Sequence, residues 1–202
     1  MFQEPVSYLL SIQIPYTYER QNEFDALTNE LSTQIIKGGY SDLVEIIFDN
    51  TGKEMTIGEK RNILYNKSKG IWSVQWDSDD WIHEDGLRLI IEALQNNPDV
   101  DCCTYEEYID IDGKIQRSNH SLKYEDWCDN FDGFDYCRTP FMKSVIKTEI
   151  AKSVPVPFER FAEDHLWSKE LKKVLKTEVH IDEQVYKYIH RSSNHNERYG
   201  IK

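Results

Sequence analysis

Ile71-Trp-Ser-Val-Gln-Trp-Asp77-Ser-Asp79-Asp80 is the stretch that decides the expected fold, because an apolar, strand-like run ends in three carboxylates within four positions. Carboxylates packed so closely repel one another unless a cation or solvent intervenes. Mg²⁺ and Mn²⁺ take oxygen ligands and often bridge carboxylates to the phosphates of a substrate, and open α/β sheets bind ligands at the carboxyl ends of their strands. The stretch fits a metal site at a strand end, and equally a helix beginning near Trp81 that Asp79 or Asp80 caps.

The composition is that of a single globular domain. A chain of 202 residues, of which 39% are apolar and 12% aromatic, can bury one full hydrophobic core. The net charge of −12 disfavours nonspecific attraction to a nucleic-acid backbone, which rewards Lys and Arg, but leaves room for a local basic groove. The sequence contains no repeat, linker or low-complexity tract.

The sequence predicts a cytoplasmic location. It has no run of eighteen apolar residues, so we expect no transmembrane helix. Glu4 and Pro5 stand where a signal peptide would carry basic residues before a long apolar core. The four cysteines form no CxxC pair and have no zinc-site spacing, so we expect ordinary thiols in a reducing compartment.

Strands and helices are expected to alternate along the first half of the chain. Apolar runs predict strands over 7–15, 43–48, 71–76 and 100–108. Apolar residues at helical spacing predict helices over 23–36, 57–68 and 84–95, with Gly38-Gly39 as the end of the first and Thr56 as the cap of the second. This order favours a largely parallel sheet covered by helices. A hairpin turn at 109–114 then opens a more irregular, aromatic-rich half.

Several short motifs follow one another in an order that resembles a known family. They are Ser11-Ile-Gln-Ile-Pro15, Glu19-Arg20, Val44-Glu-Ile-Ile-Phe-Asp49, Gly58-Glu-Lys-Arg-Asn62, Asp77-Ser-Asp79-Asp80 and Glu163-Asp164. Together they resemble the nucleotide-sugar-dependent glycosyltransferases of family 2, which adopt the GT-A fold. The similarity covers about the first half of the chain and the later acidic pair. The compact form also resembles glycosyltransferase-like proteins of large bacteriophages, some of which decorate modified DNA bases.

The resemblance implies one GT-A-like domain over 1–202, an α/β fold with a Rossmann-like mixed sheet flanked by helices. Its nucleotide-binding half would be 1–108 and its acceptor-binding half 109–202. By the same resemblance, the residues that contact the nucleotide would be Pro15, Tyr18, Arg20, Asp49, Lys60, Arg61 and Asp77.

Three of these positions have alternatives that the residues themselves leave open. Asp49 would accept a hydrogen bond from a uracil-type imide, which favours a UDP-sugar, or it would cap the turn at 50–52. Lys60 and Arg61 would point at the nucleotide, or they would lie on a solvated helix face, which suits Lys60 better. Asp77 would contact the ribose.

The metal is expected to be Mn²⁺ or Mg²⁺. By the resemblance Asp79 would bind it, and His190 or His195 near the carboxyl terminus is a candidate second ligand, since imidazole is acceptable to Mn²⁺. Asp80 would orient the other two acids or cap the next helix. Arg191 would offer its planar fork to a phosphate instead.

Glu163 and Asp164 are the candidate catalytic residues. Transfer to a hydroxyl needs a base whose pKa its surroundings tune, and the nearby Phe158, Phe161 and Trp167 would raise a carboxylate pKa by desolvation. The resemblance favours Asp164 as the base, with Glu163 as second candidate or acceptor ligand. Without it, the pair is simply an acidic first turn that offsets a helix dipole.

The expected function is metal-dependent, inverting transfer of one sugar from a nucleotide-sugar to an acceptor hydroxyl, on a glycan or a modified DNA base. Asp49-Asn-Thr-Gly52 departs from the family's usual Asp-Asp-Gly-Ser, and the chain lacks the Gln-x-x-Arg-Trp element of processive members. The alternatives are a haloacid dehalogenase-type phosphatase, a nucleotidyltransferase that uses the same acidic site, and a non-catalytic nucleotide-binding module. The first normally carries its Asp-x-Asp on the first strand, and the second needs a Gly-rich loop there.

Overall fold

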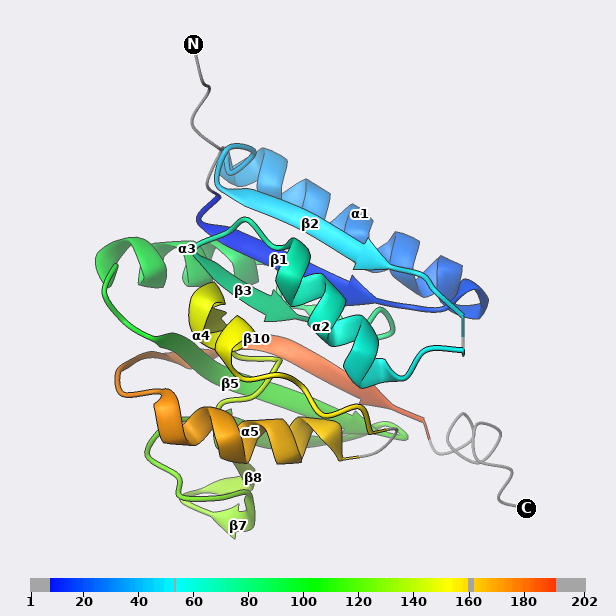
Figure 1. The fold of residues 1–202 in the computed structure, drawn as a ribbon. Helices are drawn as coiled ribbons and strands as arrows, with labels where there is room; N and C mark the ends of the chain where they lie inside the picture. Colours follow the sequence, from blue (N-terminus) through cyan, green and yellow to red (C-terminus); the bar gives the residue numbers. More distant parts are fainter. Residues whose placement is uncertain (1–7, 53, 160–161, 192–202) are drawn as a thin grey trace, which may run out of the picture.

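The computed structural model describes residues 8–52, 54–159 and 162–191. It contains one mixed sheet with helices on both faces (Figure 1). The strands are β1 (Leu10–Pro15), β2 (Val44–Asp49), β3 (Trp72–Gln75), β4 (Trp81–Ile82), β5 (Cys102–Ile111), β6 (Lys114–His120), β7 (Cys128–Phe131), β8 (Phe134–Arg138), β9 (Val145–Lys147) and β10 (Glu178–His190). The helices are the 3₁₀ turn η1 (Tyr18–Arg20), α1 (Gln21–Gly38), α2 (Ile57–Lys67), α3 (Gly86–Asn96), α4 (Thr148–Ser153) and α5 (Glu163–Val174).

The first three long strands form the predicted parallel unit. β1 is buried along its whole length between β2 and β3, and both neighbours run parallel to it. Since parallel strands end at the same edge of a sheet, Pro15 at the end of β1 stands in register with Asp49 at the end of β2. The acidic stretch after β3 opens at this same edge.

Each face of the sheet has its own core. α1 and α3 cover one face, and their apolar stripes, including Leu31 and Ile90, pack on β1 and β3. α2, α4 and α5 cover the other face (Figure 1), where Tyr65 of α2 stacks on Trp167 of α5 at 5.4 Å between ring centroids. The two helix layers hold the sheet edge that carries the acidic stretch in place.

Local signals set the ends of the helices as predicted. Thr56 caps α2 in a capping box, in which its side chain accepts from the backbone N–H of Glu59 and the Glu59 carboxylate accepts from the N–H of Thr56. α1 ends at Gly39, whose φ of +68° is the left-handed cap that favours glycine.

The expectation that Asp79 or Asp80 caps a helix beginning near Trp81 is wrong. Trp81–Ile82 forms the short strand β4, which pairs antiparallel with β10, and the next helix begins only at Gly86. The partner strand lies about a hundred positions later in the sequence, so local periodicity could not reveal it.

The second half is more regular than the sequence suggested. Strands β6 to β10 all belong to the same sheet, in which β9 lies between β3 and β5, and the hairpin between β5 and β6 lies at the predicted turn. β10 runs parallel to β5 and returns the chain to the acidic edge. Among the described helices, none is long and apolar enough to span a membrane. The four cysteines are free thiols.

Candidate active site

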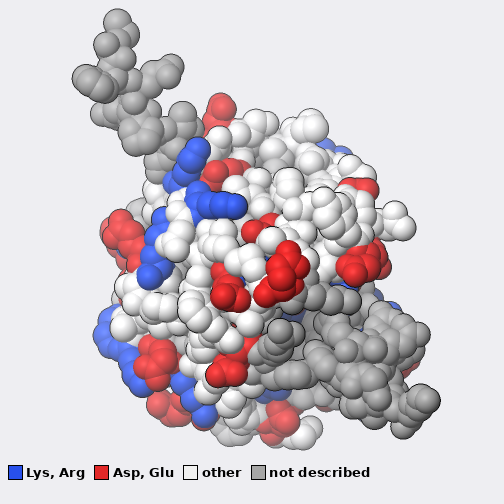
Figure 2. Space-filling view, turned by 45° about the vertical axis from the view of Figure 1, so that its right-hand side comes forward, with Lys and Arg blue, Asp and Glu red and all other residues white. Residues whose placement is uncertain are grey.

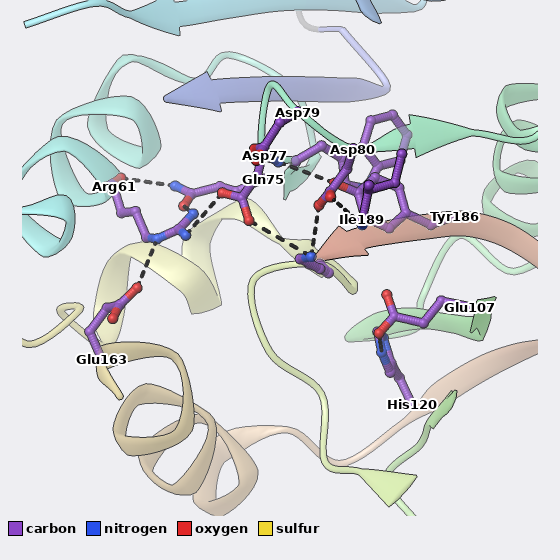
Figure 3. Close-up of polar contacts among 12 residues, drawn as sticks. Arg61, Gln75, Asp77, Asp79, Asp80, Glu107, His120, Glu163, Tyr186 and Ile189 are labelled. Atoms are coloured by element: carbon purple, nitrogen blue, oxygen red, sulfur yellow. Dashed lines mark hydrogen bonds and ion pairs between the residues drawn. The ribbon is translucent and has the colours of Figure 1, made fainter. Parts of the chain in front are cut away.

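The candidate site lies at the edge where β1, β2 and β3 end. Acidic side chains gather near the centre of the molecular face seen in Figure 2. The close-up in Figure 3 shows the carboxylates of the site itself, which come from different elements and point toward buried cations. Asp77, Asp79 and Asp80 follow β3, Glu163 begins α5, and Tyr186 comes from β10.

Arg61 of α2 joins the two acidic motifs. Its Nη2 lies 3.2 Å from Asp77 Oδ1, its Nε lies 3.5 Å from Glu163 Oε1, and its Nη1 donates to Gln75 Oε1 at 3.1 Å (Figure 3). The side chain is only 6% exposed. Burial alone would lower the pKa of Arg61, but Asp77 and Glu163 outweigh it and raise the pKa. The guanidinium therefore stays charged and fixes the strand-end acids relative to the first turn of α5.

Asp77 is held as a carboxylate. Burial would raise its pKa, yet the nearby Arg61 and Lys143 lower the pKa overall. Its Oδ2 lies 3.7 Å from Lys143 Nζ, and its backbone N–H donates to the Tyr186 hydroxyl at 3.2 Å. An ionised acceptor in this position can take a hydrogen bond from a ligand hydroxyl.

Asp80 holds the acidic loop to β10 instead of capping a helix. Its Oδ2 accepts from Lys143 Nζ at 2.9 Å and from the Tyr186 hydroxyl at 2.7 Å, and its Oδ1 accepts from the N–H of Ile189 at 2.8 Å (Figure 3). Burial raises the pKa of Asp80 to about 7, against the attraction of Lys143. Both oxygens of Asp80 are therefore committed to partners within the protein, and its expected role in orienting the other two acids stays a prediction.

Glu163 and Asp164 form the first turn of α5, directly after Ala162 in the left-handed conformation (φ +57°). Burial raises the pKa of Glu163, and the attraction of Arg61 only partly opposes it. The expected desolvation therefore acts on Glu163. Asp164 is half-buried, and its Oδ1 accepts from the N–H of His165 at 2.7 Å.

The aromatic setting expected around this pair is present only in part. Trp167 is fully buried and its indole N–H donates to the carbonyl of Val154. Phe158 is largely exposed, so it does not wall the carboxylates from water. Phe161 lies outside the described residues.

The predicted nucleotide residues at the ends of β1 and β2 lie side by side. Tyr18 in η1 is exposed. Arg20 forms an ion pair with Asp79. Asp49 accepts hydrogen bonds from the backbone N–H and the hydroxyl of Thr51, which is the turn-capping arrangement the sequence left open.

Lys60 and Arg61 do not lie on a solvated helix face. Both residues are buried, at 4% and 5% exposure. Lys60 donates to the carbonyl of Thr51, so it braces the same turn that Asp49 caps. The expectation that Lys60 suits the solvated face is therefore wrong, because a tertiary partner in the β2–α2 loop takes its ammonium group.

The side chains of the site fit a divalent ion only if a ligand's phosphates supply further oxygen atoms to it. Among the described residues, no group of three or more His, Cys, Asp or Glu side chains is placed to hold a metal. Asp79, 27% exposed and paired with Arg20, offers one accessible carboxylate. Mg²⁺ is commonly bound by one or two carboxylates plus substrate phosphates, so one such ligand suffices if the donor supplies the others.

The histidine and arginine at the end of β10 have structural contacts. The carbonyl of His190 accepts from the N–H of Asp112, and its ring lies 6.3 Å from that of Tyr188. The Arg191 guanidinium donates to both carboxylate oxygens of Asp110, at 2.9 and 3.2 Å. A protein carboxylate therefore takes the place expected for a phosphate. His195 lies outside the described residues.

Sequence reasoning missed Lys143 and the two buried glutamines of the site. Gln13 and Gln75 pair in register on β1 and β3. The Gln75 amide donates a hydrogen bond to Gln13 Oε1 and accepts one from Arg61. A usable signal existed, since each is a large polar side chain in a buried strand whose other polar residue is a serine. Lys143 follows Phe141 and Met142 in a segment without motif, and nothing local marked it.

Comparison with known structures identifies the fold. No protein-family profile matches the chain, and the search of curated proteins finds no significant match. Residues 1–349 of TarS from S. aureus in complex with UDP-GlcNAc match with a TM-score of 0.62 at 16% identity, over 90% of this chain and 58% of that one. The mannosyltransferase PcManGT from Pyrobaculum calidifontis, in complex with GDP-Man and Mn²⁺, matches with a TM-score of 0.51 at 10% identity, over 90% of this chain and 56% of that one.

These likenesses establish an α/β, GT-A-type fold, a mixed sheet flanked by helices, as the resemblance of the sequence motifs implied. The chain spans less than two thirds of the length of each of these two proteins.

Proposed function

We propose that this chain is a metal-dependent glycosyltransferase that moves one sugar from a nucleotide-sugar, a UDP-sugar by preference, to an acceptor hydroxyl with inversion. One observation carries the proposal: the Arg61 guanidinium contacts both Asp77 and Glu163. The acidic loop after β3 and the acidic pair of α5 are over eighty positions apart in sequence, yet they meet in one charged cluster. The GT-A fold supports the same reading, since TarS and PcManGT are seen with UDP-GlcNAc and GDP-Man.

The donor would lie across the ends of β1, β2 and β3. Pro15 and Asp49 adjoin there, and the Asp49 carboxylate retains acceptor capacity for a base N–H beyond its turn contacts. Asp77, kept ionised by Arg61 and Lys143, would accept from a ribose hydroxyl. Tyr18 would cover the base from the solvent side.

Asp79 would hold the divalent ion, exchanging its contact with Arg20 for the metal. Arg20 would then be free to reach the diphosphate as a bidentate donor. When bound, Mn²⁺ or Mg²⁺ supplies Lewis-acid neutralisation of charge on the diphosphate. His190 is the candidate second protein ligand by family resemblance alone.

Asp164 would act as the general base. The acceptor oxygen forms a bond to the anomeric carbon, the bond from that carbon to the diphosphate oxygen breaks, and the acceptor proton passes to the Asp164 carboxylate. Asp164 is the more accessible of the acidic pair, while the neighbouring Glu163 is tied to Arg61. Attack opposite the leaving group inverts the sugar.

Calorimetry with UDP, with and without Mn²⁺, followed by a donor-transfer assay, tests the proposal. We expect Mn²⁺-dependent binding in the wild type and in Asp164→Asn, and transfer lowered by about 10²–10⁴-fold in Asp164→Asn alone. Asp182→Asn is the matched control, because that acid is 93% exposed and lies on the far part of β10. Full transfer by Asp164→Asn would exclude it as the base. Nucleotide binding without transfer to any acceptor would identify a non-catalytic module.

A further inference from the structure

Lys143 is a buried ammonium group placed directly beneath the acidic loop. Its side chain is 9% exposed and lies in the segment that leads into β9. Nζ lies 2.9 Å from Asp80 Oδ2 and 3.7 Å from Asp77 Oδ2. A single cation therefore contacts two of the three acids that follow β3.

The surroundings of Lys143 keep it charged and in place. Its ammonium lies 3.9 Å from the centre of the Tyr188 ring and 5.0 Å from that of Tyr186, both on β10. The neighbouring acids Asp80, Asp77 and Glu107 raise its pKa although burial alone would lower it. Aromatic faces and carboxylates together compensate the charge that burial would otherwise penalise.

The backbone around Lys143 is anchored as well. The Tyr105 hydroxyl of β5 donates to the carbonyl of Lys143, and the N–H of Gln75 in β3 donates to the carbonyl of Met142 at 2.8 Å. The backbone at residues 142 and 143 is thus fixed to two strands of the sheet.

We propose that Lys143 is a positioning residue of the donor site. By holding Asp80 and one oxygen of Asp77, its ammonium keeps the loop from splaying and leaves Asp79 as the carboxylate for a divalent ion and the donor's diphosphate. This rests on the proposed function and adds a residue to it. Three carboxylates in four positions repel one another, and without Lys143 two of them would compete for the ion in a different geometry.

The charge pair can be removed without leaving an unpaired charge. Lys143→Met alone would leave Asp80 as a buried carboxylate without its cation, so we expect this variant to have a much lower free energy of unfolding. In the double variant Lys143→Met/Asp80→Asn, the amide oxygen can still accept from Ile189 and the amide N–H₂ can donate to the Tyr186 hydroxyl. Lys147→Met is the matched control, since this lysine lies in β9, four positions on, near the Trp72 ring.

The experiment measures UDP affinity by calorimetry at several Mn²⁺ concentrations and free Mn²⁺ by electron paramagnetic resonance. We expect the folded double variant to need about 10–100-fold more Mn²⁺ for UDP binding, as is typical when a residue that orients a metal ligand is lost. Lys147→Met should match the wild type. A double variant with wild-type Mn²⁺ and UDP affinity would overturn the inference and leave the proposed function intact. If the wild type bound no nucleoside diphosphate with Mn²⁺, both would fall.

Discussion

Arg61→Met tests whether the cluster is organised by the buried guanidinium. At an effective dielectric constant of about 20, unit charges at the observed 3.2 Å from Asp77 and 3.5 Å from Glu163 attract by about 5 kcal/mol each before desolvation is subtracted. Desolvation removes most of this gain, but deleting one partner leaves buried carboxylates uncompensated. We therefore expect the free energy of unfolding to fall by about 3–5 kcal/mol.

The assay is urea unfolding followed by tryptophan fluorescence, on Arg61→Met, Glu163→Gln and the double variant. The double-mutant cycle should give a coupling energy of about 1–3 kcal/mol between Arg61 and Glu163. Arg88→Met is the matched control, because Arg88 also pairs with two acids but on an open surface of α3, where such pairs contribute little. Arg88→Met should unfold at the same urea concentration as the wild type.

Two results would refute the reasoning. A coupling energy within error of zero would mean that Arg61 and Glu163 do not interact in solution. An Arg61→Met variant as stable as Arg88→Met would mean that the guanidinium is not buried between the acids.

Three further perturbations probe the frame around the site. Burial would raise the pKa of Glu107, but the attraction of His120 outweighs burial and lowers the pKa below the usual 4.5. The ionised carboxylate therefore stabilises the fold above about pH 4.5, and this stabilisation is lost as the pH falls through the folded pKa. Glu107→Gln should flatten the pH dependence of urea midpoints between about pH 5 and pH 3. Thr56→Ala removes the capping box of α2 and should lower the free energy of unfolding by about 1 kcal/mol, measured by urea titration. Gly58→Ala would place a Cβ 1.9 Å from the carbonyl oxygen of Pro157, so we expect a loss of about 1–3 kcal/mol in the same assay, and an unchanged midpoint would contradict this packing.

The parts of the fold that the sequence predicted are those with strong local signals. The apolar run of β1, the Thr56 cap and the glycine that ends α1 each act over a few residues, so periodicity and end signals were sufficient. Strand β4 was not predicted, since it forms by pairing with Tyr186 and Lys187 of β10, which are distant in sequence. Long-range pairing overrode the local helix signal.

The candidate site shows the same division. Arg61, Asp77 and Glu163 were identified from motifs, and the structure brings them together. Lys143 was not identified, because a single lysine after Phe141 and Met142 has no spacing signature, and its contacts come from segments distant in sequence. The interpretation of Lys60 as a solvated residue failed for a related reason: helical periodicity places a residue on a face but does not say what covers that face.

The charge balance of the site indicates why an acidic chain would need a divalent ion to hold a diphosphate. In direct ion pairs at the site, the four carboxylates of Asp77, Asp79, Asp80 and Glu163 meet the three cations of Arg20, Arg61 and Lys143. Such a set carries a formal charge of minus one and repels a diphosphate, whereas a divalent ion beside Asp79 would reverse its sign. Because these groups are largely buried, their potential at the site outweighs that of the exposed acids that give the chain its −12. Binding of a nucleoside diphosphate should therefore depend steeply on the divalent ion and only weakly on monovalent salt.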